Sequence, residues 1–408
     1  MFQRIVRVTQ IEGIALLALV LAAACNDGYR PPPPTQHPVT PAPRPTPAPA
    51  PTPAPTPAAT PAPPADPMVA LAARGRHTCA LRKSGALACW GNNSDGQLGD
   101  GGRVDQPRGV PVAGLSAMSE VATGLAFSCA RKSSGQVMCW GNNEDGQLGD
   151  GRGARPGSRS ASPVAVKGIT DATQLSLGDS HACVLRRAGT VSCWGLGGDG
   201  QLGAVVERSA QPLAIPGTAQ TVEVASGSNH VCARKHNGAV SCWGRNTEGQ
   251  LGDGASGSKI KPVAVKGLTD ATLLIAGGNH TCARRKTGAV VCWGNNSHGQ
   301  LGDGTTGTFA QRTPVIVAGL TNPTELALGK EHSCARMSDG RVSCWGGNSS
   351  GQLGDGGNSG HPKPAPVARL SGAVDLALGT AHSCALQSTG NATCWGSDER
   401  RALGPRRL

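Results

Sequence analysis

A pair of cysteines ten residues apart recurs seven times in this 408-residue chain, and a tryptophan follows each second cysteine. The copies start about 50 residues apart, a period typical of folds built from stacked repeats. Such a repeat cannot bury its apolar face alone, so we expect residues 68–408 to form one domain. The pairs are Cys79 and Cys89, Cys129 and Cys139, Cys183 and Cys193, Cys232 and Cys242, Cys282 and Cys292, Cys334 and Cys344, and Cys384 and Cys394.

A glycine six residues after the first cysteine of every pair predicts a hairpin inside each copy. In the first copy, a three-residue loop of Lys83-Ser84-Gly85 places residue 82 opposite residue 86, and therefore Cys79 opposite Cys89. Directly opposed strand residues lie roughly 4.5 to 5.5 Å apart at Cα, within the range that a disulfide tolerates. We therefore predict one disulfide within each copy, with the seven pairings given above.

Each copy is interpreted as four short strands, illustrated by residues 262–265, 272–276, 280–285 and 289–293. Abundant glycine and few aromatic residues suit many short strands and tight turns. Four strands in each of seven copies predict an all-β fold, a seven-bladed β-propeller of four-stranded antiparallel blades.

The way the ring closes is predicted from a strand that the first copy lacks. The first strand of the unit occurs only six times, between successive copies, and none precedes the first copy. We therefore expect the last residues, Pro405-Arg406-Arg407-Leu408, to supply the strand that the first blade lacks.

The first 25 residues have the pattern of an export signal. Arg4 and Arg7 precede an apolar run at residues 14–21 that is too short to span a membrane. The ending Ala22-Ala23-Ala24-Cys25 resembles the bacterial lipoprotein signal, which implies a lipidated Cys25, a membrane anchor and an extracytoplasmic protein. One departure is that leucine stands at position 21, one place earlier than usual, so simple cleavage after Ala24 and secretion are the alternative. Removing Cys25 from the fifteen cysteines leaves seven pairs, and this parity supports lipidation.

Residues 26–67 are predicted to be a linker, because proline, alanine and threonine make up nearly all of the segment from Pro31 to Pro67. Such a composition cannot bury a core. The linker is interpreted either as a stalk that holds the domain away from a membrane or as a plain tether.

Much of the formal net charge of +12 falls in the equivalent hairpins. A propeller relates these hairpins by rotation, so their basic residues are expected to form a positive annulus that attracts anionic partners. The alternative is a solvated rim that only keeps the protein soluble. The twelve residues are Arg82, Lys83, Arg131, Lys132, Arg186, Arg187, Arg234, Lys235, Arg284, Arg285, Lys286 and Arg336.

Three other sets of repeated residues are interpreted as structural. The histidines precede the first cysteine by two residues, but Phe127 replaces one of them where Cys129 and Cys139 remain, which argues against a metal site. The tryptophans alternate with the cysteines along a strand and are expected to pack between blades rather than stack on a ligand. The turns rich in asparagine and aspartate lack the closing glutamate of a calcium loop. The histidines are His77, His181, His230, His280, His332 and His382, and the tryptophans are Trp90, Trp140, Trp194, Trp243, Trp293, Trp345 and Trp395.

The recurring elements H-x-C-A, C-W-G-x-N and G-Q-L-G-D-G resemble the repeats of the regulator of chromosome condensation family, over the whole of residues 68–408. In the seventh copy Gly-Gln-Leu-Gly has become Arg401-Ala402-Leu403-Gly404. The resemblance implies a seven-bladed propeller. Members of the family exchange nucleotide on a small GTPase, dock on chromatin, sense light or inhibit β-lactamases, so the resemblance implies no single activity.

The sequence shows no catalytic constellation and predicts no cofactor or metal. The preferred function is a non-enzymatic, surface-tethered or secreted binding module, a monomer that recognises a protein or an anionic polymer through its loops. The alternative is an exported enzyme that acts on envelope polymers. Nucleotide exchange and chromatin binding, and with them nucleic-acid partners, are disfavoured because the predicted disulfides and export signal place the chain outside the cytosol. Residues that give this protein its own function, beyond the repeated scaffold, are expected in the irregular inserts at residues 151–162, 204–211, 305–313 and 357–363.

Overall fold

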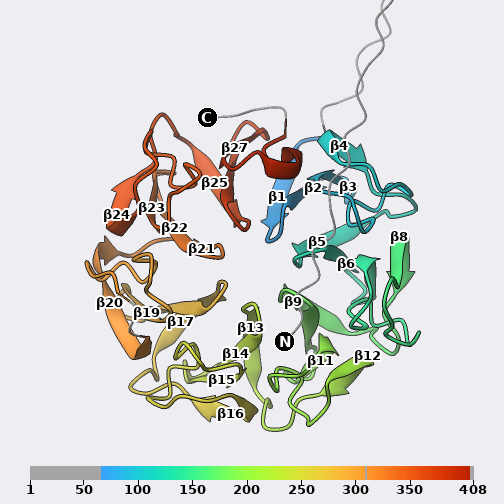
Figure 1. Cartoon of the computed structure of the whole chain (residues 1–408), viewed down its shortest axis with the longest axis horizontal. Helices are drawn as coiled ribbons and strands as arrows, with labels where there is room; N and C mark the ends of the chain where they lie inside the picture. Colours follow the sequence, from blue (N-terminus) through green and yellow to red (C-terminus); the bar gives the residue numbers. More distant parts are fainter. Residues whose placement is uncertain (1–65, 308–309, 405–408) are drawn as a thin grey trace, which may run out of the picture. The chain divides into compact units, whose positions relative to one another are not determined.

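The computed structural model describes residues 66–307 and 310–404, which form seven antiparallel sheets arranged around a central channel (Figure 1). The export signal, Cys25 and the predicted linker up to residue 65 lie outside the described residues. The first strand begins at Met68. The predicted all-β, seven-bladed β-propeller is confirmed.

Each blade begins with an inner strand beside the channel and continues outward along the sheet. Blades one to four are built from β1 (Met68–Ala73), β2 (His77–Arg82), β3 (Leu87–Gly91) and β4 (Gln106–Pro111); β5 (Met118–Thr123), β6 (Phe127–Lys132), β7 (Val137–Asn142) and β8 (Arg159–Ala165); β9 (Ala172–Leu177), β10 (His181–Arg186), β11 (Val191–Leu196) and β12 (Arg208–Ala214); and β13 (Thr221–Ser226), β14 (His230–Lys235), β15 (Val240–Gly244) and β16 (Lys259–Ala264). Blades five to seven are built from β17 (Ala271–Ala276), β18 (His280–Arg285), β19 (Ala289–Gly294) and β20 (Gln311–Thr321); β21 (Glu325–Leu328), β22 (His332–Arg336), β23 (Val342–Gly346) and β24 (His361–Pro366); and β25 (Ala373–Leu378), β26 (His382–Gln387) and β27 (Ala392–Gly396), followed by the 3-10 helix η1 (Glu399–Arg401).

The hairpin between the second and third strands has the predicted register in all seven blades. In blade one Cys79 pairs with Cys89, and Gly85 closes the three-residue loop with a φ of 81°. A Cβ on Gly85 would lie 2.7 Å from the Cα of Ala117, so only glycine fits this turn.

The predicted disulfide is present in every blade, and all seven pairings are confirmed. The Cα atoms of the bridged cysteines are 4.0 to 4.1 Å apart, slightly closer than the spacing expected for opposed strand residues. The bridges join Cys79 to Cys89, Cys129 to Cys139, Cys183 to Cys193, Cys232 to Cys242, Cys282 to Cys292, Cys334 to Cys344, and Cys384 to Cys394.

The predicted division of the chain into blades was shifted by one strand. The strand that contains Val263 pairs with β15 of the preceding copy, where Val263 lies opposite Cys242, and it does not pair with the hairpin that follows it. It is therefore the outermost strand of its blade. A periodic sequence looks the same from either starting point, so the period alone could not choose between the two divisions.

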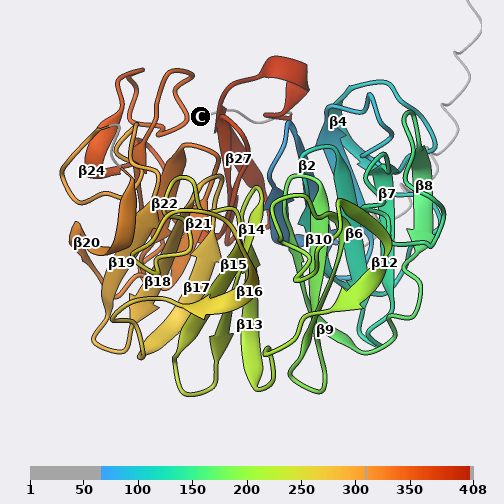
Figure 2. The same ribbon diagram turned by 60° about the horizontal axis from the view of Figure 1, so that its bottom comes forward.

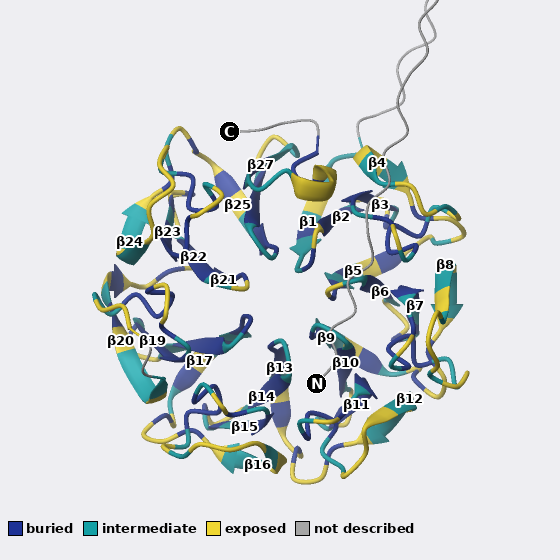
Figure 3. Cartoon of the chain, viewed as in Figure 1, coloured by how far each residue is buried: buried dark blue, intermediate teal, exposed yellow. Residues whose placement is uncertain are grey.

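The hydrophobic core is divided among the gaps between neighbouring blades. Seven clusters of buried side chains each combine residues of two adjacent blades. Between blades one and two, for example, Leu98 and Val112 pack with Val121 and Trp140. Figure 3 shows the buried residues on the inner and middle strands and the exposed residues on the outer strands and loops. Each blade therefore depends on its neighbours for most of its apolar burial.

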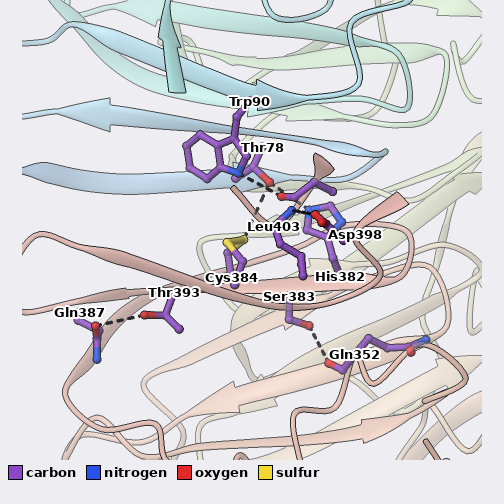
Figure 4. Close-up of a disulfide and its surroundings, with 12 residues drawn as sticks. Thr78, Trp90, Gln352, His382, Ser383, Cys384, Gln387, Thr393, Asp398 and Leu403 are labelled. Atoms are coloured by element: carbon purple, nitrogen blue, oxygen red, sulfur yellow. Dashed lines mark hydrogen bonds between the residues drawn. A yellow bond between two sulfur atoms is a disulfide. The ribbon is translucent and has the colours of Figure 1, made fainter. Parts of the chain in front are cut away.

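The ring closes between blades seven and one, but not as predicted. The first blade already has four strands, whereas blade seven has three among the described residues, so the expectation that 405–408 complete the first blade was wrong. Those four residues lie outside the described part of the chain. The closure includes Leu403, which is 6% exposed in the core cluster between the two blades, and Trp90, whose Nε1 donates to the carbonyl oxygen of Ala402 at 3.1 Å (Figure 4).

Candidate functional site: the hairpin end of the propeller

The loops of the propeller lie at two opposite ends because the strands of each blade are antiparallel. We call the end formed by the loops between second and third strands the hairpin end. The opposite end, which carries the loops between third and fourth strands, is the loop end. Figure 2 shows η1 and the long loops before β24 at the loop end. All twelve predicted basic residues belong to the hairpin end.

Five of these twelve residues are held by a carboxylate of their own blade. Arg131, Arg234 and Arg336 pair with a glutamate of the adjacent inner strand at 2.6 to 2.7 Å, and they are only 16 to 19% exposed. Arg186 and Arg285 pair with aspartates at 2.8 and 2.9 Å. The carboxylates are Glu120, Glu223, Glu325, Asp171 and Asp270.

Two of these glutamates also join neighbouring blades. Glu120 accepts a hydrogen bond from the backbone N–H of Leu175 in blade three, and Glu325 accepts one from Leu376 in blade seven, both at 3.0 Å. Burial raises the pKa of Glu120 from its ordinary value, although Arg131 opposes the shift. The paired arginines therefore belong to the framework of the ring and are not free to bind a partner.

The other seven basic residues have no carboxylate within ion-pair distance among the described residues. Arg82 and Arg284 donate instead to the backbone oxygens of Asp66 and Pro323, each at 2.7 Å. These two arginines are thus also engaged in the fold. The remaining five have neither kind of contact within the described part of the chain. Three of them are exposed, namely Lys83, Arg187 and Lys286, and two are half-buried, namely Lys132 and Lys235. These five free side chains, one in each of blades one to five, form what we call the cationic arc.

The cationic arc does not extend to blades six and seven. The corresponding positions there are Met337, Ser338, Gln387 and Ser388. The structure thus narrows the predicted annulus to blades one to five. Most carboxylates near the arc are engaged within the fold: Asp66 binds the backbone and hydroxyl of Ser84, besides the five that hold arginines.

The repeated histidines are buried structural residues. The Nε2 of His77 lies 2.8 Å from the hydroxyl of Ser128 in the next blade, and that hydroxyl donates to the carbonyl of Gln97. The hydroxyl proton is therefore used, so Nε2–H is the donor and the imidazole is neutral. Burial lowers the pKa of His77 to about 3. Equivalent contacts join His230 to Thr281, His280 to Ser333, His332 to Ser383, and His382 to Thr78.

Two blades depart from this chain of contacts. His181 faces the position of Val231 in blade four, and both of its ring nitrogens are buried without a hydrogen-bond partner. In blade two Phe127 replaces the histidine and packs in the same cluster as Ala182 of blade three. An apolar pair has thus replaced a hydrogen-bonded pair at one interface, whereas the next interface keeps an unsatisfied histidine.

The tryptophans and the asparagine-rich turns are also part of the framework. Six of the seven indole Nε1 groups donate to the carbonyl of a Gly-Gln-Leu-Gly glutamine at 2.9 to 3.0 Å. In the turn of blade one, Asn93 accepts from the N–H of Leu98 and donates to Asp100. The predicted packing of the tryptophans between blades is confirmed. The part of the chain that the structure describes contains no cluster of three metal-ligating side chains.

Arg74 spans the central channel, a feature that the sequence analysis missed. From the turn after β1, its guanidinium donates to Asp179 of blade three at 3.0 Å and to the carbonyls of Ser226 and Gly277 in blades four and five. On the hairpin side of Arg74, the inner strands line a cavity of about 340 Å³. One arginine thus joins four blades, and its position in a single repeat gave no periodic signal.

A half-buried carboxyl pair lies beside the same channel. Asp375 accepts a hydrogen bond from the backbone N–H of Leu71 at 2.6 Å, across the ring closure. Burial, together with the neighbouring Glu325 carboxylate, raises the pKa of Asp375 to about 8. Asp375 is therefore protonated near neutral pH, and the two carboxyl groups avoid placing two charges together.

These features define a class of protein, a disulfide-stapled seven-bladed propeller that carries the cationic arc at its hairpin end. The described residues contain no helix with the length and apolar character needed to cross a bilayer. The family model described as the RCC1-like domain matches residues 170–407, more than half of the chain. Models of the regulator of chromosome condensation (RCC1) repeat match residues 69–97 and 119–147, and 84–131 and 134–185. The chain therefore belongs to the regulator of chromosome condensation repeat family.

Solved structures of the same fold are distant in sequence. Yeast RCC1 (Prp20), solved with Kap60 bound, is 23% identical and has a TM-score of 0.70, with 78% of this chain and 80% of that chain covered. Prp20p from Saccharomyces cerevisiae, in a study that also reports binding to Gsp1p and histones, is 22% identical with a TM-score of 0.69 and coverage of 83% and 84%. Human WBSCR16 is 22% identical with a TM-score of 0.69, with 77% of this chain and 85% of that chain covered. No curated protein matches the sequence.

Proposed function

We propose that this protein is an exported, non-enzymatic binding module, tethered to a membrane through lipidated Cys25, whose hairpin end binds an anionic partner. The partner is an acidic polymer or the acidic face of another protein. The observation that carries the proposal is the cationic arc, in which five blades each present a basic side chain without a carboxylate partner among the described residues.

Electrostatics support this choice of end. Cations that lie together at one end raise the local concentration of an anionic partner, and the effect falls with ionic strength. The ion-paired arginines add little to this field because their charges are compensated at 2.6 to 2.9 Å. The rigid ring fixes the five blades relative to one another, which lowers the entropic cost of binding.

Two further observations support the remaining parts of the proposal. Seven buried disulfides fit an oxidising compartment outside the cytosol, where such bonds persist. The fold itself suits a binding module, since a relative of the same fold, Prp20p, is reported to bind Gsp1p and histones. We place binding at the hairpin end, and we carry over neither of those partners.

The proposal is tested by retention of the full-length protein on a heparin-like matrix over a salt gradient. A quadruple variant should elute at clearly lower salt than the wild type, and its changes are Lys132→Gln, Arg187→Gln, Lys235→Gln and Lys286→Gln. The matched control removes four exposed charges from the loop end, Arg312→Gln, Lys330→Gln, Lys363→Gln and Arg401→Gln. Equal losses in the two variants would show that only total charge matters and would refute the assignment to the hairpin end.

A further inference from the structure

The insert of blade two lines an open cavity at the loop end, at the opposite end of the propeller from the cationic arc. The cavity has a volume of about 630 Å³ and lies between the segment after Asp150 and the start of β8. Ligand pockets commonly occupy ~300 to 1,000 Å³, so an organic molecule of moderate size fits this volume. Four arginines line it: Arg103 from blade one, and Arg152, Arg155 and Arg159 from blade two.

Two of the four guanidinium groups are uncompensated. Arg152 lies 3.6 Å from Asp150, and Arg159 lies 3.6 Å from Asp95. Arg103 and Arg155 have no side-chain hydrogen bond or ion pair within the described residues. The lining therefore carries more positive than negative charge. The excess positive charge comes from Arg103 in blade one and Arg155 in blade two.

Asn143 adds a neutral donor to the same cavity. Asn143 is only 3% exposed, and it lines the cavity. Its Oδ1 accepts from the N–H of Leu148 at 3.0 Å, but its Nδ2 has no hydrogen-bond partner in the described part of the chain. Because Asn143 lines the cavity, its Nδ2 is available to donate a hydrogen bond to a ligand that accepts one.

The equivalent asparagines of four other blades do not share this arrangement. In each of them, Nδ2 donates both to the aspartate seven residues later and to a backbone carbonyl of the following loop. In blade two Gly141 pairs with Ser160, which leaves a longer connection than between the equivalent paired residues of the other four blades. Neither the carbonyls of this connection nor Asp150 reach the Nδ2 of Asn143. The longer loop has thus exchanged an internal contact for an open cavity. The four asparagines are Asn93, Asn246, Asn296 and Asn348.

We propose that this cavity binds a tetrahedral oxyanion, as a phosphate or sulfate ester. Arg103 and Arg155 supply charge-assisted hydrogen bonds, for which planar guanidinium groups suit phosphate and sulfate oxygens. The Nδ2 of Asn143 donates to one oxygen from the buried side. This site is separate from the proposed anionic-partner site at the hairpin end.

The test is calorimetric titration of the full-length protein with inorganic phosphate and, separately, with inorganic sulfate at low ionic strength. We expect saturable binding of at least one anion at one site, and the stronger of the two identifies the class of ester. The double variant Arg103→Gln and Arg155→Gln should weaken binding by about tenfold or more, since each lost charge-assisted contact is worth roughly one factor of ten. The control, Arg312→Gln with Lys363→Gln, removes the same charge from other blades and should bind like the wild type.

A second variant, Asn143→Asp, tests the position of Asn143 in the site, because it removes the amide donor and places a negative charge there. It keeps an oxygen for the N–H of Leu148 but replaces the amide donor by a carboxylate, so the anion affinity should fall while the melting temperature stays close to that of the wild type. The absence of saturable binding, or equal losses in the control, would overturn the proposal. The quadruple hairpin-end variant should retain anion binding, which distinguishes failure of this site from failure of the hairpin-end proposal.

Discussion

The indole Nε1 of Trp90 donates to the carbonyl oxygen of Ala402 at 3.1 Å, which joins the first repeat to the last. Ala402 stands where the other copies have the glutamine of Gly-Gln-Leu-Gly, and a backbone carbonyl does not depend on the side chain that its residue carries. The seventh copy has therefore lost its sequence motif and kept its contact. The adjacent Leu403 keeps the motif's leucine in the core.

Truncation of Leu403 should destabilise the ring. Leu403 is 6% exposed in the cluster between blades seven and one, and Leu→Ala at buried sites typically costs about 2 to 5 kcal/mol. We expect Leu403→Ala to lower the free energy of unfolding by about 2 kcal/mol or more, measured by urea denaturation. Leu125→Ala, at a leucine that is 46% exposed, should change it little. Similar values for the two variants would argue against closure by the seventh loop.

Removal of one disulfide should weaken a blade without changing its fold. The bridge between Cys282 and Cys292 joins residues ten apart, which on the chain-entropy model stabilises by roughly 2 to 3 kcal/mol. We expect the double variant Cys282→Ala and Cys292→Ala to retain the wild-type far-UV circular dichroism and to unfold at lower urea concentration. A loss of the β-sheet spectrum in this variant would contradict the independent stapling of blades.

The buried histidines should make stability fall in acid. Burial lowers the pKa of His181, His230, His280 and His332 to about 3, while the unfolded imidazole titrates near 6.5. The unfolded chain therefore binds more protons between these two values, so stability is fully present above about pH 6.5 and is lost as pH falls toward 3. Each histidine contributes roughly 1 kcal/mol per pH unit in the middle of that range.

His181→Phe tests this account at a single interface, because Phe127 already occupies the same position in blade two. The unpaired imidazole of His181 disappears, so we expect a shallower loss of melting temperature between pH 6 and 4 and no loss at neutral pH. His230→Phe is the matched comparison, since it leaves the hydroxyl of Thr281 without its histidine donor and should destabilise at neutral pH. The same neutral-pH effect in both variants would contradict the different hydrogen bonding of the two histidines.

Asp375 should act in the opposite direction, between its ordinary pKa of 3.8 and its raised pKa of about 8. Its pKa is raised to about 8, so the native state holds a proton that the unfolded state has released, and stability falls as pH rises toward and through 8. Asp375→Asn keeps an oxygen for the N–H of Leu71 and carries no titratable proton. We expect the melting temperature of this variant to change less than that of the wild type between pH 6 and 9. Parallel curves would exclude a protonated Asp375 in the native state.

Much of the local geometry was predictable because it depends on short spacings. The pairing of Cys79 with Cys89 follows from a ten-residue interval and a glycine that closes the turn. Three ion pairs were also predictable in principle, because each joins residues eleven apart across adjacent strands: Glu120 with Arg131, Glu223 with Arg234, and Glu325 with Arg336. The same spacing explains an exception: in blade five Leu273 stands in place of the glutamate, and Arg284 has no carboxylate partner among the described residues.

Long-range features were not predictable from the repeat. The assignment of Val263 to the preceding blade depends on which strands pair, and Arg74 reaches Asp179 across the channel from 105 residues away. The cavity of blade two required knowing that Asp150 does not reach the Nδ2 of Asn143. These contacts occur once, so the sevenfold pattern carried no information about them.

The proposed role outside the cytosol depends on blades that are oxidised in the cell. The most direct measurement is peptide mapping by mass spectrometry of protein isolated from its native cells, with free thiols blocked at lysis. The account predicts seven cystine peptides with the pairings found here, from Cys79 with Cys89 to Cys384 with Cys394, and no blocked thiol among these fourteen residues. Blocked thiols at all fourteen positions would place the folded chain in a reducing compartment and contradict the account.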